Sequence, residues 1–275
     1  MPSRDSSIRL PCTPISAIVS GKLDFQVKVR VIHLWIVPDL MKPTEDGTIQ
    51  MLFLDDKYHK IQATVRKDLI PKYMDQLEES SAYVFEKFMV GSKDAFYKSI
   101  GHKYKLNFMT STTVFKVTAP EIPRYHFDFV PFSEILNATD ESSYSFSICS
   151  DVIGHVVEKD VVKETIVKGK KSKVTNLTLK DLENNRLHCS LWNDFVVRFH
   201  QFMDTHNSSE PPVMILQLVR LKKNSYLGVM GVSNIFNGTK MLLNADIPDV
   251  AEYKVKMDDT ERESTEGFIT AMAPD

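Results

Sequence analysis

A tryptophan lies on the polar side of a predicted strand. Residues 186–192 read RLHCSLW. Because neighbouring side chains of a strand face opposite sides, the leucines and the cysteine share one face, and Trp192 shares the other with His188 and Ser190. A planar indole on a polar face can stack against another planar group, a nucleobase among them, or pack into a neighbouring loop. This position is therefore the first candidate for binding.

A run of lysines is the second candidate. Val167–Lys173 reads VKGKKSK and holds Lys170, Lys171 and Lys173. It lies between the first two predicted strands of the second half of the chain. Lysines there could neutralise phosphate groups, which would make binding depend on salt. A solvated hairpin tip and a weak nuclear localisation patch are the alternatives.

Four further residues combine an aromatic or basic side chain with predicted exposure. Arg66 follows Gln62 and Thr64 on the polar face of the strand IQATV, and Arg30 lies on the polar face of residues 25–31. Phe236 precedes an Asn-Gly turn signal, and Tyr97 lies in the lysine-rich stretch FYKSIGHKYK. Each could contact a nucleic acid. A surface charge for the arginines, a plug of the barrel end for Phe236 and a solvated loop for Tyr97 remain open.

Motifs of catalysis and metal binding are missing from the sequence. The eight histidines show no HxxxH or HExxH grouping, and the three cysteines form no CxxC. There is no glycine-rich phosphate loop, GxSxG or kinase motif. We therefore expect a protein that is not an enzyme and that needs no cofactor or metal.

The elements that must position these residues occur twice along the chain. Strands are predicted at 25–31, 49–54 and 61–65, a helix within 67–80, and strands at 82–90 and 104–109. The order recurs with strands at 144–157, 175–179 and 186–192, a helix at 195–203, and strands at 213–221 and 226–243. Repetition of a unit of this size indicates two similar domains.

Five strands with one helix between the third and fourth is the layout of the OB-fold, a small, partly open barrel. The sequence thus predicts a mainly β protein with two tandem OB-folds. The expected segments are 1–19 (N-terminal segment), 20–118 (first OB-fold), 119–143 (connector), 144–247 (second OB-fold) and 248–275 (acidic C-terminal tail).

Composition and charge narrow the partners. A hydrophobic content of 43% with 25% charged residues is typical of a soluble globular protein, and no apolar run approaches the roughly 18 residues of a membrane helix. No secretory signal is evident, and few cysteines favour a reducing compartment, cytosol or nucleus. The net charge of −2 hides a basic body, because the last 30 residues hold nine acidic and three basic residues. A basic body permits a nucleic-acid partner.

Particular segments resemble a known family. HCSLWNDF resembles the third strand of the second DNA-binding OB domain in the large (70 kDa) subunit of replication protein A, and VMGVSNIFNGTKMLL looks like the closing hairpin of that domain. RYHFDFVPFSEI is similar to the connector between its two central OB domains. IQATV, YVFEKF and HKYKLNFMTSTTVF are similar to parts of the first. The resemblance covers about residues 20–255 and is closest to plant-type members.

The resemblance implies that the chain binds single-stranded DNA in the nucleus, during DNA replication, repair or recombination. Trp192 and Phe236 match stacking aromatics of the family's second domain. Tyr97 falls at one stacking position of the first domain, Arg66 replaces a phenylalanine at the other, and Arg30 matches a basic position.

Partners beyond DNA stay open. In the family a third, zinc-bearing OB domain holds the smaller subunits, and the resemblance includes no counterpart of it, which makes assembly with those subunits doubtful. No membrane partner is expected. Two other functions remain alternatives: an OB-fold module that binds proteins, and an RNA or telomeric single-strand binder.

Overall fold

Two compact units divide the chain. The computed structural model describes residues 11–21, 25–39, 41–92, 101–138, 148–149, 151–167, 169–206, 210–223 and 228–271. The first unit comprises residues 1–127 with 236–238, and the second comprises the remainder.

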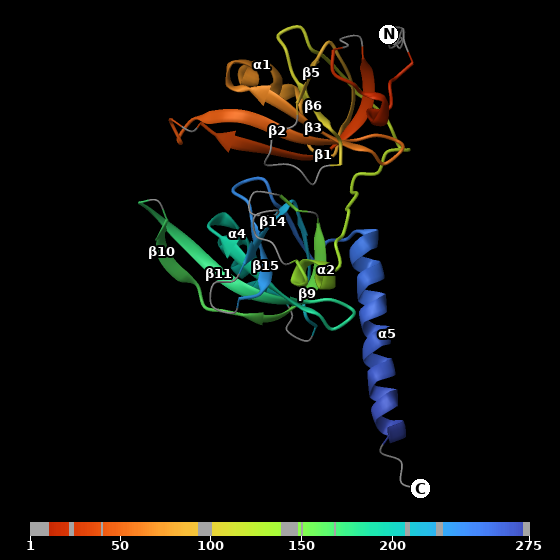
Figure 1. Cartoon of the computed structure of the whole chain (residues 1–275), viewed down its shortest axis with the longest axis vertical. Coiled ribbons are helices and arrows are strands. Elements are labelled where there is room, and N and C mark those ends of the chain that lie inside the picture. The colour runs from red at the N-terminus through yellow and green to blue at the C-terminus, as the bar shows by residue number, and fades with distance from the viewer. Residues whose placement is uncertain are drawn as a thin grey trace. The chain divides into compact units, whose positions relative to one another are not determined.

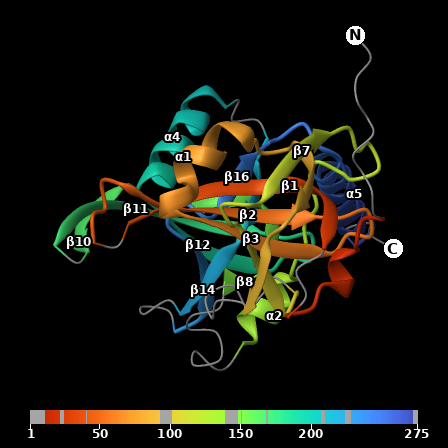
Figure 2. The same cartoon turned by 90° about the horizontal axis from the view of Figure 1, so that it is seen from above.

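A seven-stranded sheet forms the first unit, in the order β5-β6-β3-β2-β1-β4-β7. Its strands are β1 (Gln26–Pro38), β2 (Asp46–Leu54), β3 (Lys60–Arg66), β4 (Ala82–Glu86), β5 (Met89–Ser92), β6 (Tyr104–Asn107) and β7 (Thr113–Val117). Figure 2 shows β1, β2 and β3 side by side. The helical segments are η1 (Ile15–Ala17), η2 (Lys67–Leu69), α1 (Ile70–Tyr73) and η3 (Met74–Gln76). The last three lie between β3 and β4, where the sequence predicts the helix.

The second unit repeats this plan with additions. Its strands are β8 (Ile148–Cys149), β9 (Val152–Lys159), β10 (Lys163–Val167), β11 (Lys170–Lys180), β12 (Arg186–Trp192), β13 (Val213–Gln217), β14 (Val219–Lys223), β15 (Met230–Asn234) and β16 (Lys240–Leu243). Its helices are α2 (Phe132–Leu136), α4 (Asp194–Thr205) and α5 (Pro248–Ala271). β10 and β11 form a hairpin that projects from the sheet (Figure 1).

Both units close their sheets by the same device. The fourth strand of each barrel is split, so that its first half pairs with the first strand and its second half with the fifth. In the first unit β4 pairs with β1 and β5 with β6. In the second unit β13 pairs with β9 and β14 with β15. The split occurs at Lys87 (φ 57°) and at Leu218 (φ 59°), where the left-handed backbone turns the strand.

The two units share one more feature of the OB topology. In each unit the third strand runs parallel to the fifth: β3 is parallel to β6, and β12 is parallel to β15. The predicted tandem OB-folds are confirmed. Each barrel encloses its own core, around Phe53 and Phe85 in the first and Leu187 and Phe199 in the second.

The structure differs from the predicted elements in several places. The expected strand at 213–221 is split at Leu218, and the one at 226–243 is interrupted by the turn between β15 and β16. The sequence did not predict β10. The N-terminal segment contributes Ile15 and Ile18 to the first core. Most of the acidic tail forms α5, of which Val250, Tyr253 and Met257 are buried.

The limits that we propose for the barrels, residues 20–118 and 144–247, enclose β1–β7 and β8–β16 respectively.

Candidate nucleic-acid interface

Trp192 ends β12 on the outer face of the second barrel. Its neighbours Leu191 and Cys189 are buried in the core, and the half-buried indole lies on the other side of the strand. The backbone N–H of Trp192 donates a 2.7 Å hydrogen bond to Asn234 Oδ1. Lys222 Nζ lies 5.4 Å from the centroid of the ring, close enough for a cation to be attracted to the π face. The indole is therefore on the face that strand alternation predicts, with a positive charge beside it.

Next to Trp192, mostly polar residues form two rows across four strands. One row consists of Asn176, Ser190, Ser233 and Arg220, and the next of Thr178, His188, Gly231 and Lys222. Ser190 Oγ donates to Asn176 Oδ1 at 2.9 Å, and this bond orients the amide. Hydroxyl, amide, imidazole and cationic groups on one face can bind both the edges of bases and phosphate oxygens.

Two basic residues of this face were not predicted. In β14 the sequence VRLKK alternates, with Val219 and Leu221 buried, so Arg220 and Lys222 point outward. That alternation was available in the sequence, but the split at Leu218 was needed to place β14 beside β15. Arg220 Nε is buried and has no hydrogen-bond partner among the described residues. A buried donor without a partner favours a ligand that supplies an acceptor.

Gly231 allows the two central strands of this face to pair closely. A Cβ atom at Gly231 would lie only 2.5 Å from the backbone oxygen of His188, well inside van der Waals contact. The parallel pairing of β12 with β15 therefore depends on the missing side chain, and this pairing holds Trp192 near Lys222.

The predicted lysines lie on the hairpin of β10 and β11. Along β11, Lys170 alternates onto the same face as Asn176, whereas Lys171 and Lys173 alternate onto the other, and Glu164 pairs with Lys173 across the hairpin. Lys163 was missed by the sequence reasoning and pairs with Val174, which in turn pairs with Trp192. The structure thus places Lys170 and Lys163 on the outer face of the second barrel that carries Trp192, which we call the tryptophan face. Lys168 lies outside the described residues.

Arg66 occupies the matching position of the first barrel. It ends β3 as Trp192 ends β12, with Ala63 and Val65 in the core behind it. The side chain is exposed, and NH2 of its guanidinium lies 3.2 Å from Asp68 Oδ2. The correspondence of the two positions, predicted from the repeat, holds in the structure. Here, however, the aromatic ring is replaced by a charge whose neighbour is a carboxylate.

The other polar side chains on this face of the first barrel form hydrogen bonds with one another. Gln50 Oε1 accepts hydrogen bonds from Gln62 Nε2 at 2.8 Å and from Thr64 Oγ1 at 2.9 Å. Gln50 Nε2 donates to Thr48 Oγ1 at 2.9 Å. Gln50, Gln62 and Thr64 are all buried. These groups are therefore less accessible to a ligand than the half-buried Ser190 and Asn176 of the second barrel.

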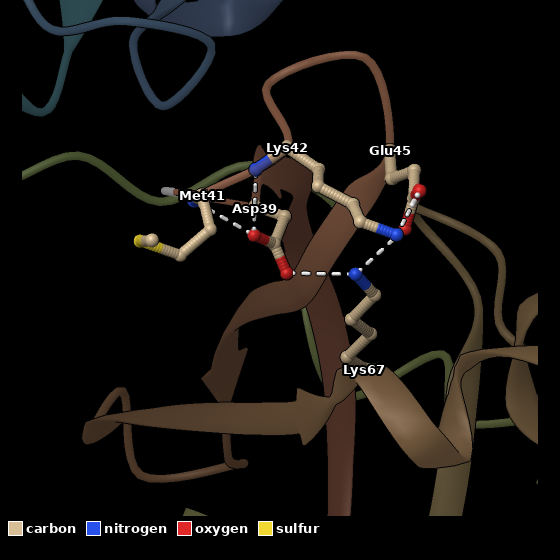
Figure 3. Close-up of polar contacts among 5 residues, drawn as sticks. All are labelled: Asp39, Met41, Lys42, Glu45 and Lys67. Atoms are coloured by element: carbon tan, nitrogen blue, oxygen red, sulfur yellow. Dashed lines mark hydrogen bonds and ion pairs between the residues drawn. The ribbon is translucent and has the colours of Figure 1, made fainter.

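Ion pairs hold the loop between β1 and β2, which corresponds to the lysine-rich hairpin of the second barrel. Lys67 Nζ lies 2.7 Å from Asp39 Oδ2 and 2.8 Å from Glu45 Oε2, and Lys42 Nζ lies 3.1 Å from Glu45 Oε1 (Figure 3). Asp39 Oδ1 also accepts the backbone N–H groups of Met41 and Lys42. The hydrogen bond from Lys67 and these two N–H groups lower the pKa of Asp39 to about 2. The charges of this loop are thus paired with one another.

Arg30 is engaged within the first unit. Its guanidinium donates three hydrogen bonds to backbone oxygens: to Ile122 at 2.7 Å, to Ser80 at 2.6 Å and to Ala119 at 2.6 Å. Desolvation, with a smaller contribution from Arg124, lowers its pKa. The geometry gives Arg30 a structural use, which is to tie the segment leaving the barrel to β1.

The chain is similar in sequence and in fold to proteins of known identity. The 70 kDa DNA-binding subunit of replication protein A from Drosophila melanogaster is 24% identical over 272 residues, which are 97% of this chain and 43% of that protein. A replication protein A 70 kDa relative from Oryza sativa subsp. japonica is 22% identical, over 90% of this chain and 25% of its own length. A solved replication protein A heterotrimer bound to single-stranded DNA superposes with a TM-score of 0.59 at 21% identity, over 90% of this chain and 55% of that one.

The chain is similar to the large subunit of replication protein A. The resemblance predicted from the sequence is confirmed, and the superposition supports the tandem OB-fold. The chain spans less than half the length of these replication protein A relatives. In addition, residues 17–138 match a family described as "Domain of unknown function DUF223".

Two further residues were assigned through replication protein A, Phe236 and Tyr97. Phe236 is 65% exposed in the turn between β15 and β16, two residues after Asn234, whose Oδ1 accepts the backbone N–H of Trp192. Tyr97 lies outside the described residues, within the connection from β5 to β6. Both remain proposals.

No helix in the described part of the chain is long and apolar enough to span a membrane. Among the same residues, no group of three or more His, Cys, Asp or Glu side chains could hold a metal ion.

Proposed function

We propose that this protein binds single-stranded DNA without catalysis, in the nucleus, as part of DNA replication, repair or recombination. The observation that carries the proposal is the outer face of the second barrel. There Trp192, the cation of Lys222 and the Arg220 N–H that no described residue satisfies lie among polar side chains on adjacent strands. The similarity to replication protein A subunits supports the same conclusion.

The chemistry of binding follows from the arrangement. Single strands present unstacked bases, and stacking on an aromatic side chain contributes about 1–3 kcal/mol per base with little dependence on sequence. Trp192 provides the ring. Lys222, Arg220 and Lys170 lie on the same face to neutralise phosphates, and each released counterion adds to the salt dependence.

We propose that the two barrels contribute unequally. The first barrel offers Arg66, which can stack on a base or pair with phosphate, but its remaining polar groups and its β1–β2 loop are engaged internally. The second barrel therefore supplies most of the binding free energy.

The test is fluorescence anisotropy with labelled oligo-dT. Trp192→Ala should weaken binding about tenfold, because stacking on one ring is lost. Phe115→Ala, which removes an exposed aromatic on β7, is the matched control and should change nothing. Unchanged affinity of Trp192→Ala would overturn the assignment of the site.

A second measurement tests the charges. Lys222→Gln should reduce the slope of log K against log salt by about 0.7, the value for one contact to a single strand. Lys254→Gln, on α5, should leave the slope as it is. Competition with RNA and with duplex DNA separates the DNA proposal from an RNA-binding role. The absence of salt-dependent oligonucleotide binding would favour a protein-interaction module instead.

A further inference from the structure

An apolar cavity of about 380 Å³ lies in the second unit, formed by segments that the DNA-binding proposal does not use. Its lining includes the apolar side chains of Phe129, Val130, Phe132, Ile153 and Leu182. Helix α5 forms one wall through Tyr253, and the turn between β11 and β12 forms another. The volume is that of a site for a small ligand or a few side chains of a peptide.

The walls of this cavity are held in place by hydrogen bonds. Tyr253 Oη donates to the backbone oxygen of Lys180 at 2.9 Å, which fixes α5 to the end of β11. Asp181 accepts the backbone N–H groups of Glu183 and Asn185 at 3.0 and 2.8 Å, which fixes the turn. A Cβ atom at Gly154 would lie 2.8 Å from Phe132, so the aromatic ring packs directly on β9. The site is preformed and would lose little entropy on binding.

Carboxylates line the edge of the cavity. Asp181, Glu183, Asp249 and Glu252 all belong to the lining, and Lys256, which lies 2.6 Å from Glu252, is the one basic residue among the described lining side chains. A phosphate backbone would be repelled by this negative field, whereas a cationic segment would be attracted.

We propose that this cavity binds a peptide segment of a partner protein in which one large apolar side chain is flanked by lysines or arginines. The apolar side chain enters the cavity and contacts Phe132 and Ile153. The flanking cations pair with Asp249 and Glu252 of α5 and with Glu183 of the facing turn. An apolar anchor within a charged rim is the usual anatomy of a peptide-binding surface.

The probe is a fluorescein-labelled peptide of sequence GKKWLKKG, with GEEWLEEG as the charge-reversed control. Anisotropy should show saturable one-to-one binding of the lysine peptide and none of the glutamate peptide. Asp249→Asn with Glu252→Gln should weaken binding about tenfold, because two ion pairs at the rim of the cavity are lost. The matched control is Asp258→Asn with Asp259→Asn, which removes the same charge from exposed positions of the same helix outside the cavity.

Three results would overturn the proposal. Equal loss of peptide affinity in the rim variant (Asp249→Asn with Glu252→Gln) and in the control variant would show attraction to the net charge of the helix rather than to the cavity. Displacement of the peptide by oligo-dT would place it on the tryptophan face. Self-association of the protein that the rim variant abolishes would identify a second copy of this chain as the occupant.

One further variant separates the anchor from the charges. Leu182→Trp fills the cavity from the half-exposed turn and should abolish binding while the thermal transition of the second unit stays within a few degrees. Retained binding would contradict insertion of an apolar anchor. Trp192→Ala should leave peptide binding unchanged, so failure of the DNA proposal and failure of this one give different results.

Discussion

Adding one methyl group at Gly231 should damage both the second barrel and its binding face. The Cβ of Gly231→Ala would lie 2.5 Å from the backbone oxygen of His188. Because that oxygen belongs to the neighbouring strand, relief requires β12 and β15 to separate, and these are the strands that hold Trp192 near Lys222.

The expected loss of stability is about 2 kcal/mol. Overpacking against a rigid contact costs up to about 3 kcal/mol. Replacing glycine by alanine also stabilises the folded state by about 0.7 kcal/mol, because the unfolded chain loses conformational entropy. With a urea m-value of about 2 kcal/mol/M, the midpoint of unfolding should fall by about 1 M.

Gly91 provides a matched control in the first barrel. There a Cβ would also meet an atom at 2.5 Å, but this atom is the side-chain amide nitrogen of Asn107. A side chain can rotate away whereas a paired strand cannot, so Gly91→Ala should cost less than about 1 kcal/mol. In both variants the new Cβ would meet an atom at 2.5 Å, but that atom is a side-chain nitrogen in one and a backbone oxygen in the other.

The two tryptophans make the assay specific, since Trp35 lies in β1 and Trp192 in β12. In a Trp35→Phe background, urea unfolding followed by tryptophan fluorescence reports on the second barrel alone. Gly91→Ala is followed in the reciprocal Trp192→Phe background. Equal destabilisation by the two glycine variants, or none by Gly231→Ala, would refute the packing argument.

Two further predictions concern the first unit. Arg30→Lys should lower the free energy of unfolding in urea by about 2 kcal/mol, because an ammonium cannot reach all three carbonyls. The affinity for oligo-dT, measured by anisotropy, should change less than about twofold. A variant that keeps its stability but loses DNA binding would contradict the structural role. For Asp39, the folded pKa of about 2 lies below the ordinary 3.8, so its ion pairs stabilise the β1–β2 loop at neutral pH and are lost as the pH falls between these values. A carboxyl titration by NMR should give the low midpoint, and Lys67→Met should raise it towards 3.8; a midpoint unchanged by Lys67→Met would contradict the pairing.

Much of the fold was predictable because its signals are local. Alternation in FQVKVRV and RLHCSLW identified β1 and β12, and repetition of the order of elements identified two barrels. The split of the fourth strand was not predictable. It depends on left-handed backbone at Lys87 and Leu218, residue types with no preference for that conformation, which the closure of each sheet imposes.

The candidate site shows the same division. Strand parity placed Trp192 outward, and the repeat matched it to Arg66. Parity would also have found Lys222, had β14 been recognised as a separate strand. Arg30 looked like a solvent-facing cation, but its partners lie 50 to 92 residues away in the chain.

By itself, then, the sequence determined which side chains of a strand share a face, because that property has a period of two residues and needs no distant partner. It also determined that the unit occurs twice. Only the tertiary structure decided which cations reach the indole, which barrel keeps its polar groups accessible, and that α5 completes an apolar cavity with an acidic rim. Those outcomes depend on pairings between segments far apart in the chain, whose geometry no local pattern encodes.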